Sequence, residues 1–391
     1  MVDFRLNKEQ LTIRDAVREF VTKELKPLAQ EYDAKTDPKD CFPIDLVKTA
    51  STLDLRTLNV PEEYGGVECD QITLAVILEE LGAGDLGFAS LIGQHTKYID
   101  YLSKLCNEEQ KAEWLPRLVE DDTFLIASAI TEPDAGTDSQ LPYEEPGAGM
   151  STFAERKGDE YIINGTKHFI SNGGAAKLYF VFARTKENAP FTESVSIFLV
   201  PPETPGFSVA RIHDKLGRRL MLNAELVFSD ARIPAGNLVG EENKAWQMFY
   251  GQSPGINNTI ACLVGGIRTC YEESLDFAKK RIQGGVPIIK HSSIGTMLAE
   301  MRVKVEASRA LLWKNAWSWD QKYEYDPKMN YLTKAFVNRM ALEVVNDTME
   351  IFGGMATMKD MPIEKYLRDI YTIQHAYGHP SMNLVKGMPT I

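Results

Sequence analysis

GDEYIINGTKHFISNGG occupies residues 158–174. β-branched and aromatic residues stand on both sides of Asn164-Gly165, a favoured pair for two-residue hairpin turns, so we predict a β-hairpin that turns there. In the strand that follows, Phe169 and Ser171 are two residues apart and are expected on the same side. An aromatic ring beside a hydroxyl suits a planar heteroaromatic cofactor, although an ordinary half-buried strand has the same pattern.

Similar short runs continue on both sides of this segment. They are rich in β-branched and aromatic residues, and Gly, Pro and Asp separate them at hairpin distances. No helix-length stretch lies between them, so we predict an antiparallel β domain over 123–235 and no βαβ units. The other runs lie at 124–130, 178–183, 194–200 and 207–212.

The regions before and after this β block have a helical pattern. Apolar residues recur every three or four positions over 1–122, and long heptad-like stretches cover 294–319 and 332–352. We therefore predict an α+β multidomain fold. Its parts are an N-terminal helical domain (1–122), the β domain (123–235) and a C-terminal helical bundle (236–391).

Composition restricts the class of protein. The chain has 391 residues, 43 Lys+Arg against 55 Asp+Glu, and a formal net charge of -12. Its 44% hydrophobic and 25% charged residues are ordinary for a globular protein. The acidic total argues against binding nucleic acid or an anionic membrane. The five cysteines show no CxxC pair or zinc-ligand spacing, so we expect reduced thiols, no metal and a cytoplasmic location.

Two further motifs have the small residues that leave backbone N–H groups open to an anion. TEPDAGTD, residues 131–138, directly follows an apolar run, and Gly353-Gly354 precedes PIEKYLRD at 362–369. Each could also be a plain turn. No GxGxxG follows a predicted strand, which makes a Rossmann NAD site unexpected.

In this order and spacing, the segments resemble the acyl-CoA dehydrogenase family of flavoproteins. The resemblance covers essentially the whole chain and includes KLGRR (215–219), IPAGNLVG (233–240) and MLAEM (297–301). It implies an FAD enzyme (EC 1.3) with a C-terminal four-helix bundle, assembled as a homotetramer that is a dimer of dimers. It also implies an acyl-CoA substrate and an electron-transfer flavoprotein as electron acceptor.

The resemblance also implies roles for individual residues. Thr131 and Ser171 would hydrogen-bond the isoalloxazine, and Phe169, where the family more often has Trp, would pack against it. Further contacts to FAD phosphates, CoA or the adenosine end, some of them from a neighbouring subunit, would come from Gly136, Thr137, Arg281, Gly353, Gly354 and His379.

The usual catalytic base is missing. Counting from the Arg-Asp pair, the position of the family's Glu holds Tyr377, and the alternative stretch 256–262 has no acid. A phenol, with a reference pKa of ~10, is a weak base at neutral pH, so Tyr377 could instead be a pocket wall. His375, His379 and Asp85 are the other candidates, although Asp85 could be structural. The loop 139–150 is an insertion relative to familiar members, with an open role.

Three functions follow from these observations. The first is FAD-dependent dehydrogenation of an acyl-CoA thioester by a relocated base, on a cyclic or already unsaturated acyl group. The second is a flavin monooxygenase or a non-redox eliminating enzyme on the same scaffold. The third is a non-catalytic subunit that binds CoA or flavin.

Overall fold

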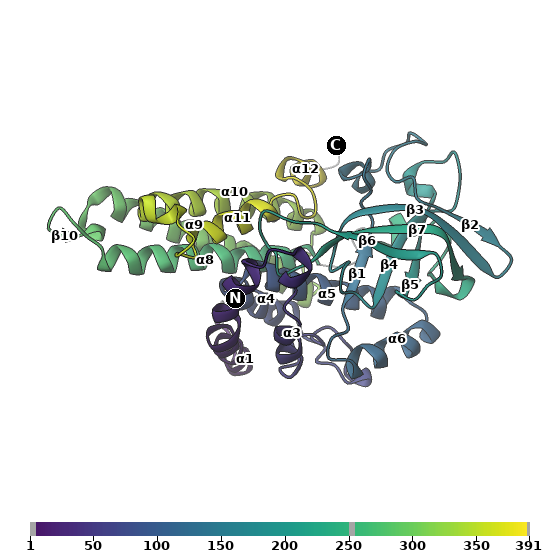
Figure 1. Cartoon of the computed structure of the whole chain (residues 1–391), viewed down its shortest axis with the longest axis horizontal. Coiled ribbons are helices and arrows are strands. Elements are labelled where there is room, and N and C mark those ends of the chain that lie inside the picture. The colour runs from purple at the N-terminus through teal and green to yellow at the C-terminus, as the bar shows by residue number, and fades with distance from the viewer. Residues whose placement is uncertain (1–4, 250–254, 389–391) are drawn as a thin grey trace.

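The computed structural model describes residues 5–249 and 255–388, and it has the expected order of helices, sheet and helices (Figure 1). Polar residues begin the N-terminal helices: Asn7 forms a capping box at the first, and Asp70 and Asp85 cap α4 and α5. These helices are α1 (Lys8–Phe20), α2 (Lys26–Asp33), α3 (Ile44–Ser51), α4 (Gln71–Gly84), α5 (Leu86–Leu105) and α6 (Glu108–Glu120).

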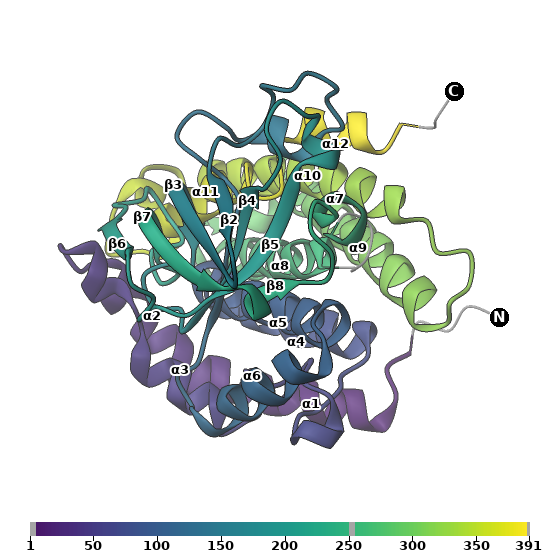
Figure 2. The ribbon, with the colours of Figure 1, turned by 90° about the vertical axis from the view of Figure 1, so that its right-hand side faces the viewer.

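The middle of the chain forms one sheet in the order β6-β7-β3-β2-β4-β5-β8, with β1 paired to β4. Most pairs are antiparallel as predicted, but β4 pairs in parallel with both β1 and β2. Figure 2 shows α5 and α6 along one side of this sheet. The strands are β1 (Ile126–Ala129), β2 (Phe153–Lys157), β3 (Glu160–Ser171), β4 (Leu178–Arg184), β5 (Val195–Val200), β6 (Phe207–Ile212), β7 (Asn223–Pro234) and β8 (Leu238–Val239).

The predicted hairpin turn at Asn164-Gly165 is wrong. The chain turns between β2 and β3 at Gly158, whose φ is +65°. Asn164 and Gly165 lie inside β3, where the pairing with β7 slips by one residue. A Cβ on Gly165 would lie 2.4 Å from Thr152 Oγ1, so glycine permits a close approach there. The Asn164 side chain bonds the backbone N–H of Asp230 on β7 (2.8 Å) and does not close a turn.

The C-terminal helices form the expected bundle, and α4 packs tightly against it (Figure 1). A Cβ on Gly82 of α4 would lie 2.2 Å from the carbonyl oxygen of Cys262, so the backbones nearly touch. A buried ion pair between Glu80 of α4 and Arg268 of α8 (2.7 Å) adds to this contact. The helices are α7 (Ala245–Phe249), α8 (Ile256–Lys280), α9 (Ser292–Asp320), α10 (Pro327–Phe352), α11 (Ile363–Ile373) and α12 (Pro380–Lys386).

Two features of the bundle bear on the site. The short hairpin β9 (Ile282–Gln283) and β10 (Val286–Pro287) lies at the end of the molecule opposite the sheet, whereas α12 returns toward the sheet (Figure 1). Within the described residues, no helix is both long and apolar enough to cross a bilayer.

Candidate active site

The turn after β1 is held by a buried ion pair that the sequence did not reveal. Glu132 accepts hydrogen bonds from Lys167 Nζ (2.8 Å) and from the backbone N–H groups of Ser151 (2.6 Å) and Thr152 (2.9 Å). Although burial opposes it, this set of donors lowers the pKa of Glu132 to about 2. Thr131, which the resemblance places at the isoalloxazine, is thereby fixed beside β3, where its carbonyl accepts from His168 N–H (2.8 Å).

A second slip in the β3–β7 pairing lies between Lys167 and Ile170, so Phe169 lies within it and Ser171 just beyond it. Phe169 has a φ of +58° and leaves 59% of its surface exposed, which is unusual for a large apolar ring. The bulge breaks the strict alternation on which the expected same-side placement rested. Asn223 Nδ2 instead links the two residues, 2.7 Å from the Phe169 carbonyl and 3.5 Å from Ser171 Oγ.

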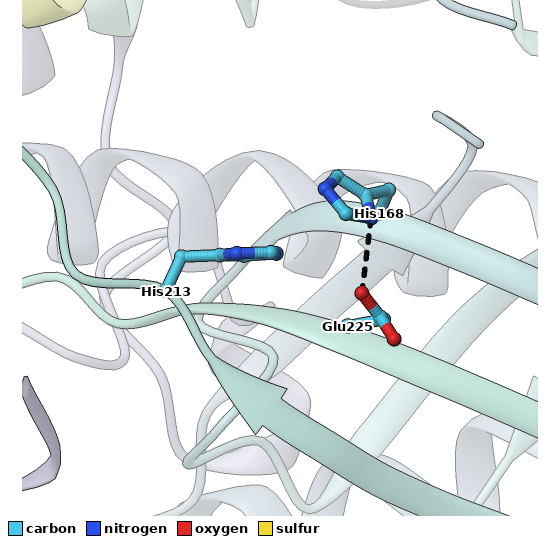
Figure 3. A group of neighbouring side chains, drawn as sticks. All are labelled: His168, His213 and Glu225. Atoms are coloured by element: carbon cyan, nitrogen blue, oxygen red, sulfur yellow. Dashed lines mark ion pairs between the residues drawn. The ribbon is translucent and has the colours of Figure 1, made fainter. Parts of the chain in front are cut away.

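Three polar side chains gather beside the Phe169 ring: His168 from β3, Glu225 from β7 and His213 from the segment after β6 (Figure 3). Their possible ligand atoms lie within 4.8 Å of one another, a group that the sequence did not predict. Glu225 is already paired with His168 Nδ1 (3.2 Å) and Arg211 (3.3 Å). The two imidazoles pack against Phe169 with ring centres 4.1 and 4.9 Å away, so the group supports the exposed ring.

Gly136 and Thr137 belong to a loop with space around its backbone, but the Gly136 N–H, which the sequence led us to expect open to an anion, is bonded within the loop. Asp138 accepts from the N–H groups of Gly136 (2.8 Å) and Gly149 (3.1 Å), which ties the two ends of the insertion together. A Cβ on Gly136 would meet no atom within 4 Å. The insertion is also anchored by Arg184, whose Nε donates to the Met150 carbonyl (2.7 Å).

Arg281, Gly353 and Gly354 lie together at the end of the bundle far from the sheet. Arg281 ends α8 and precedes β9, and its N–H donates to the Phe277 carbonyl (2.8 Å). The Phe277 ring stacks on Phe352 (4.2 Å), the residue before Gly353. Gly353 has a φ of +58°, and a Cβ on either glycine would meet no atom within 4 Å. One chain therefore does not bring these residues to Phe169 (Figure 1).

Tyr377 lies against α5, and its hydroxyl group donates a hydrogen bond to that helix. Its OH lies 3.2 Å from Gln94 Oε1, and burial holds its pKa well above the usual value of 10. Its φ of +59° is rare for a bulky residue and marks a strained segment. These properties favour the pocket-wall interpretation of Tyr377.

The Asp85 carboxylate already has partners within the fold. It caps α5 through Phe88 N–H (2.7 Å) and pairs with Lys365, which also contacts Asp369 (2.6 Å). This buried triad favours the structural interpretation of Asp85. His375 and His379 are exposed, with their rings stacked 5.4 Å apart, and His379 begins α12.

A cavity of about 80 Å³ lies between α5, α10, α12 and the segment around Tyr377. Lys97 of α5 points its ammonium toward four aromatic rings, and the nearest, Tyr377, has its centre 4.2 Å away. Lys386 of α12 lines the same cavity and donates to Gln140 Oε1 of the insertion (2.7 Å). None of the described residues that line the cavity is Asp or Glu. The only sequence signal for Lys97 was a lysine within the mostly apolar helix 86–102.

The comparisons with known proteins agree with this architecture. Three descriptions match in chain order: acyl-CoA dehydrogenase N-terminal domain (7–122), middle domain (127–231) and C-terminal domain (257–382). The fold and the three matches define a flavoprotein-type oxidoreductase, and the chain belongs to the acyl-CoA dehydrogenase family.

Individual relatives match over nearly their whole length. An acyl-CoA dehydrogenase of Bacillus subtilis is 32% identical over 371 residues, which is 94% of each chain. The butyryl-CoA dehydrogenase of Megasphaera elsdenii superposes with a TM-score of 0.91 at 29% identity, covering 99% of this chain and 98% of that one. The FAD complex of PigA matches with a TM-score of 0.88 at 25% identity, covering 98% of each.

Proposed function

We propose that this protein is an FAD-dependent acyl-CoA dehydrogenase whose proton acceptor is not the usual glutamate. The observation that supports this most directly is an acid-free cavity beside Tyr377, in a chain that also exposes the Phe169 ring on its β domain. Thr131 and Ser171 are half-buried in the same domain. The cavity beside Tyr377 contains no carboxylate from the described residues.

The residues present fit FAD. An exposed aromatic ring that two imidazoles hold from behind is a surface for a flat heterocycle. The open backbone at Gly136, Gly353 and Gly354 leaves room where a side chain would otherwise stand. When bound, FAD supplies an acceptor for the hydride that leaves the β-carbon of the acyl group.

This chain's own residues would bind and orient the reactants. Thr131 and Ser171 would hydrogen-bond the edge of the isoalloxazine, and Phe169 would cover it. Tyr377 and Gln94 would shape the wall against the acyl carbons. The substrate loses one proton and one hydride and becomes the enoyl thioester. A cyclic or already unsaturated acyl group remains our proposal for the substrate.

The cofactor site would need two subunits. Arg281, Gly353 and Gly354 lie at the opposite end of the molecule from Phe169, so they would hold the pyrophosphate of a neighbour's FAD. His379 begins α12 on the side of the sheet and would contact the adenosine end of an FAD there. This supports an assembly of at least two copies, and a homotetramer built as a dimer of dimers remains our proposal. We expect Arg281→Ala to reduce the flavin that stays bound through gel filtration, because an exposed guanidinium contact to phosphate would be lost. Unchanged flavin content would contradict the cross-subunit site.

Anaerobic mixing of the yellow holoenzyme with a panel of acyl-CoA thioesters tests the proposed reaction. We expect at least one thioester to bleach the flavin and an electron-transfer flavoprotein to restore the colour. A protein that needs an external reductant and oxygen to turn over would be a monooxygenase. Product formed without any flavin bleaching would indicate non-redox elimination, and a colourless protein would indicate a non-catalytic subunit.

A further inference from the structure

Two buried lysines, Lys97 and Lys334, and the half-buried Lys386 lie near the cavity beside Tyr377, and they differ in what they bond. Lys386 donates to Gln140, and Lys334 of α10 is buried but does not line the cavity. Lys97 lines the cavity and makes no hydrogen bond or ion pair with the described residues. Its amine is therefore the cavity lysine that is open to a ligand.

The position of Lys97 is fixed by packing along its whole length. Its aliphatic stem lies against the backbone of Gly255, where an added Cβ would be 2.5 Å from Lys97 Cγ. Its Nζ lies 4.2 Å from the ring centre of Tyr377, 5.0 Å from Tyr98 and 5.1 Å from Phe249. The amine thus stands next to the residue that occupies the position of the family's glutamate.

We propose that the ε-amino group of Lys97 accepts the α-proton of the acyl-CoA, an assignment that rests on the proposed function. The α-C–H bond breaks and its proton moves to the Nζ lone pair. The electron pair of that bond forms the new Cα=Cβ double bond, while the hydride from the β-carbon carries two electrons to the flavin. Lys97 then gives its proton to solvent, which returns the amine to its neutral form.

The groups around Lys97 favour its neutral amine, the form that can accept a proton. Among the described residues, the titratable groups that face Lys97 are tyrosines or cations: Tyr98 and Tyr101 from α5, Tyr331 from α10, Tyr377, and Lys386 from α12. Burial and the charge of Lys386 lower the pKa of Lys97 to about 7. A lysine with such a pKa is partly neutral at physiological pH and matches the requirement for a general base.

Two substitutions distinguish a role of Lys97 as proton acceptor from a role as a positive charge. Lys97→Met removes the amine, and Lys97→Arg keeps a permanent cation that cannot accept a proton. We expect both to slow anaerobic flavin bleaching by ~10²–10⁴-fold with FAD still bound. Lys334→Met, at a buried lysine off the cavity wall, is the matched control and is expected to keep the wild-type rate. Lys97→Arg at the wild-type rate would overturn the proposal and indicate that Lys97 binds an anionic acyl group.

A second readout does not depend on turnover. Competitive acetylation of the holoenzyme through a pH series, read by mass spectrometry, reports the pKa of each amine. We expect Lys97 to be half-labelled near pH 7, to be protected by a bound acyl-CoA, and to shift to higher pH in Lys386→Met. Labelling of Lys97 like an ordinary surface lysine, with no protection, would overturn the proposal.

The proposed function and the role of Lys97 can each prove wrong in a distinguishable way. If no acyl-CoA bleaches the wild-type flavin, the proposed function is wrong and the role of Lys97 falls with it. If an acyl-CoA bleaches the wild type and Lys97→Met equally fast, the proposed function stands and only the assignment of Lys97 is wrong.

Discussion

Lys167 and Lys97 are both buried lysines near the proposed reaction centre, but their amines have different partners. Lys167 meets the Glu132 carboxylate and the Ile130 carbonyl oxygen (3.1 Å), so its charge is compensated. Lys97 meets only aromatic faces among the described residues. Burial lowers both pKa values, to about 8 for Lys167 and about 7 for Lys97.

The difference separates a structural ion pair from a site prepared for chemistry. The hydrogen bonds around Glu132 fix the turn that carries Thr131. They also occupy the Lys167 amine, so it has no N–H left for a ligand. Burying the Lys97 amine without a hydrogen-bond partner removes it from water and destabilises its charged form. Such an arrangement is expected where a protein needs a group with a shifted pKa. The following predictions test whether the two lysines differ as described.

The largest effect is expected from breaking the closed pair. Lys167→Met would leave the Glu132 carboxylate buried without its cation and should lower the free energy of unfolding by about 3–5 kcal/mol. Urea unfolding of the holoenzyme at fixed protein and FAD concentration measures it. Lys23→Met, which removes a fully exposed pair with Glu19, is the control and is expected to change the stability little, because solvent screens the pair. Equal losses in both variants would show that the Glu132–Lys167 pair is not structural.

A slightly smaller effect is expected from acid. The folded state lowers the pKa of Glu132 from 4.5 to about 2. A carboxyl group with a lowered pKa stabilises the fold above its unfolded pKa, and this stabilisation is lost as pH falls through its folded pKa. We expect about 3 kcal/mol to disappear between roughly pH 4.5 and pH 2. Stability curves measured against pH should lose this component in Glu132→Gln; an identical acid slope in the variant would contradict the account.

The smallest effect is expected from removing the open lysine. Lys97→Met replaces an unpaired buried amine with an apolar side chain of similar length, so no buried charge is left behind. The free energy of unfolding should stay within about 1 kcal/mol of the wild type or rise. A loss as large as that of Lys167→Met would mean that Lys97 is held by contacts that the rings alone do not explain.

The sequence predicted the layers of this fold better than its local turns. Periodicity and strand composition predicted the helix, sheet and helix order, and the ordered motifs led to the family. Asn164-Gly165 failed as a turn because it lies inside β3, where its glycine allows a close contact with Thr152 directly before β2. Such a contact has no local sequence signal.

The site was predictable only in part, for a similar reason. Thr131, Phe169 and Ser171 come from motifs whose spacing is visible in the chain, and their cofactor roles stay predictions. Lys97, by contrast, lies on a helix that the sequence shows only as amphipathic. Its neighbours Tyr377 and Lys386 are nearly 300 residues away in the chain, so they reach Lys97 only when the segment from Tyr377 through α12 folds back to α5.

The pH dependence of the rate of anaerobic flavin bleaching by a reactive acyl-CoA, at subsaturating substrate, tests the central claim most directly. If neutral Lys97 accepts the proton, the rate rises with pH through a midpoint near 7, the pKa of the amine. If charged Lys97 instead binds an anionic substrate, the rate falls through the same midpoint, and that result would contradict the account.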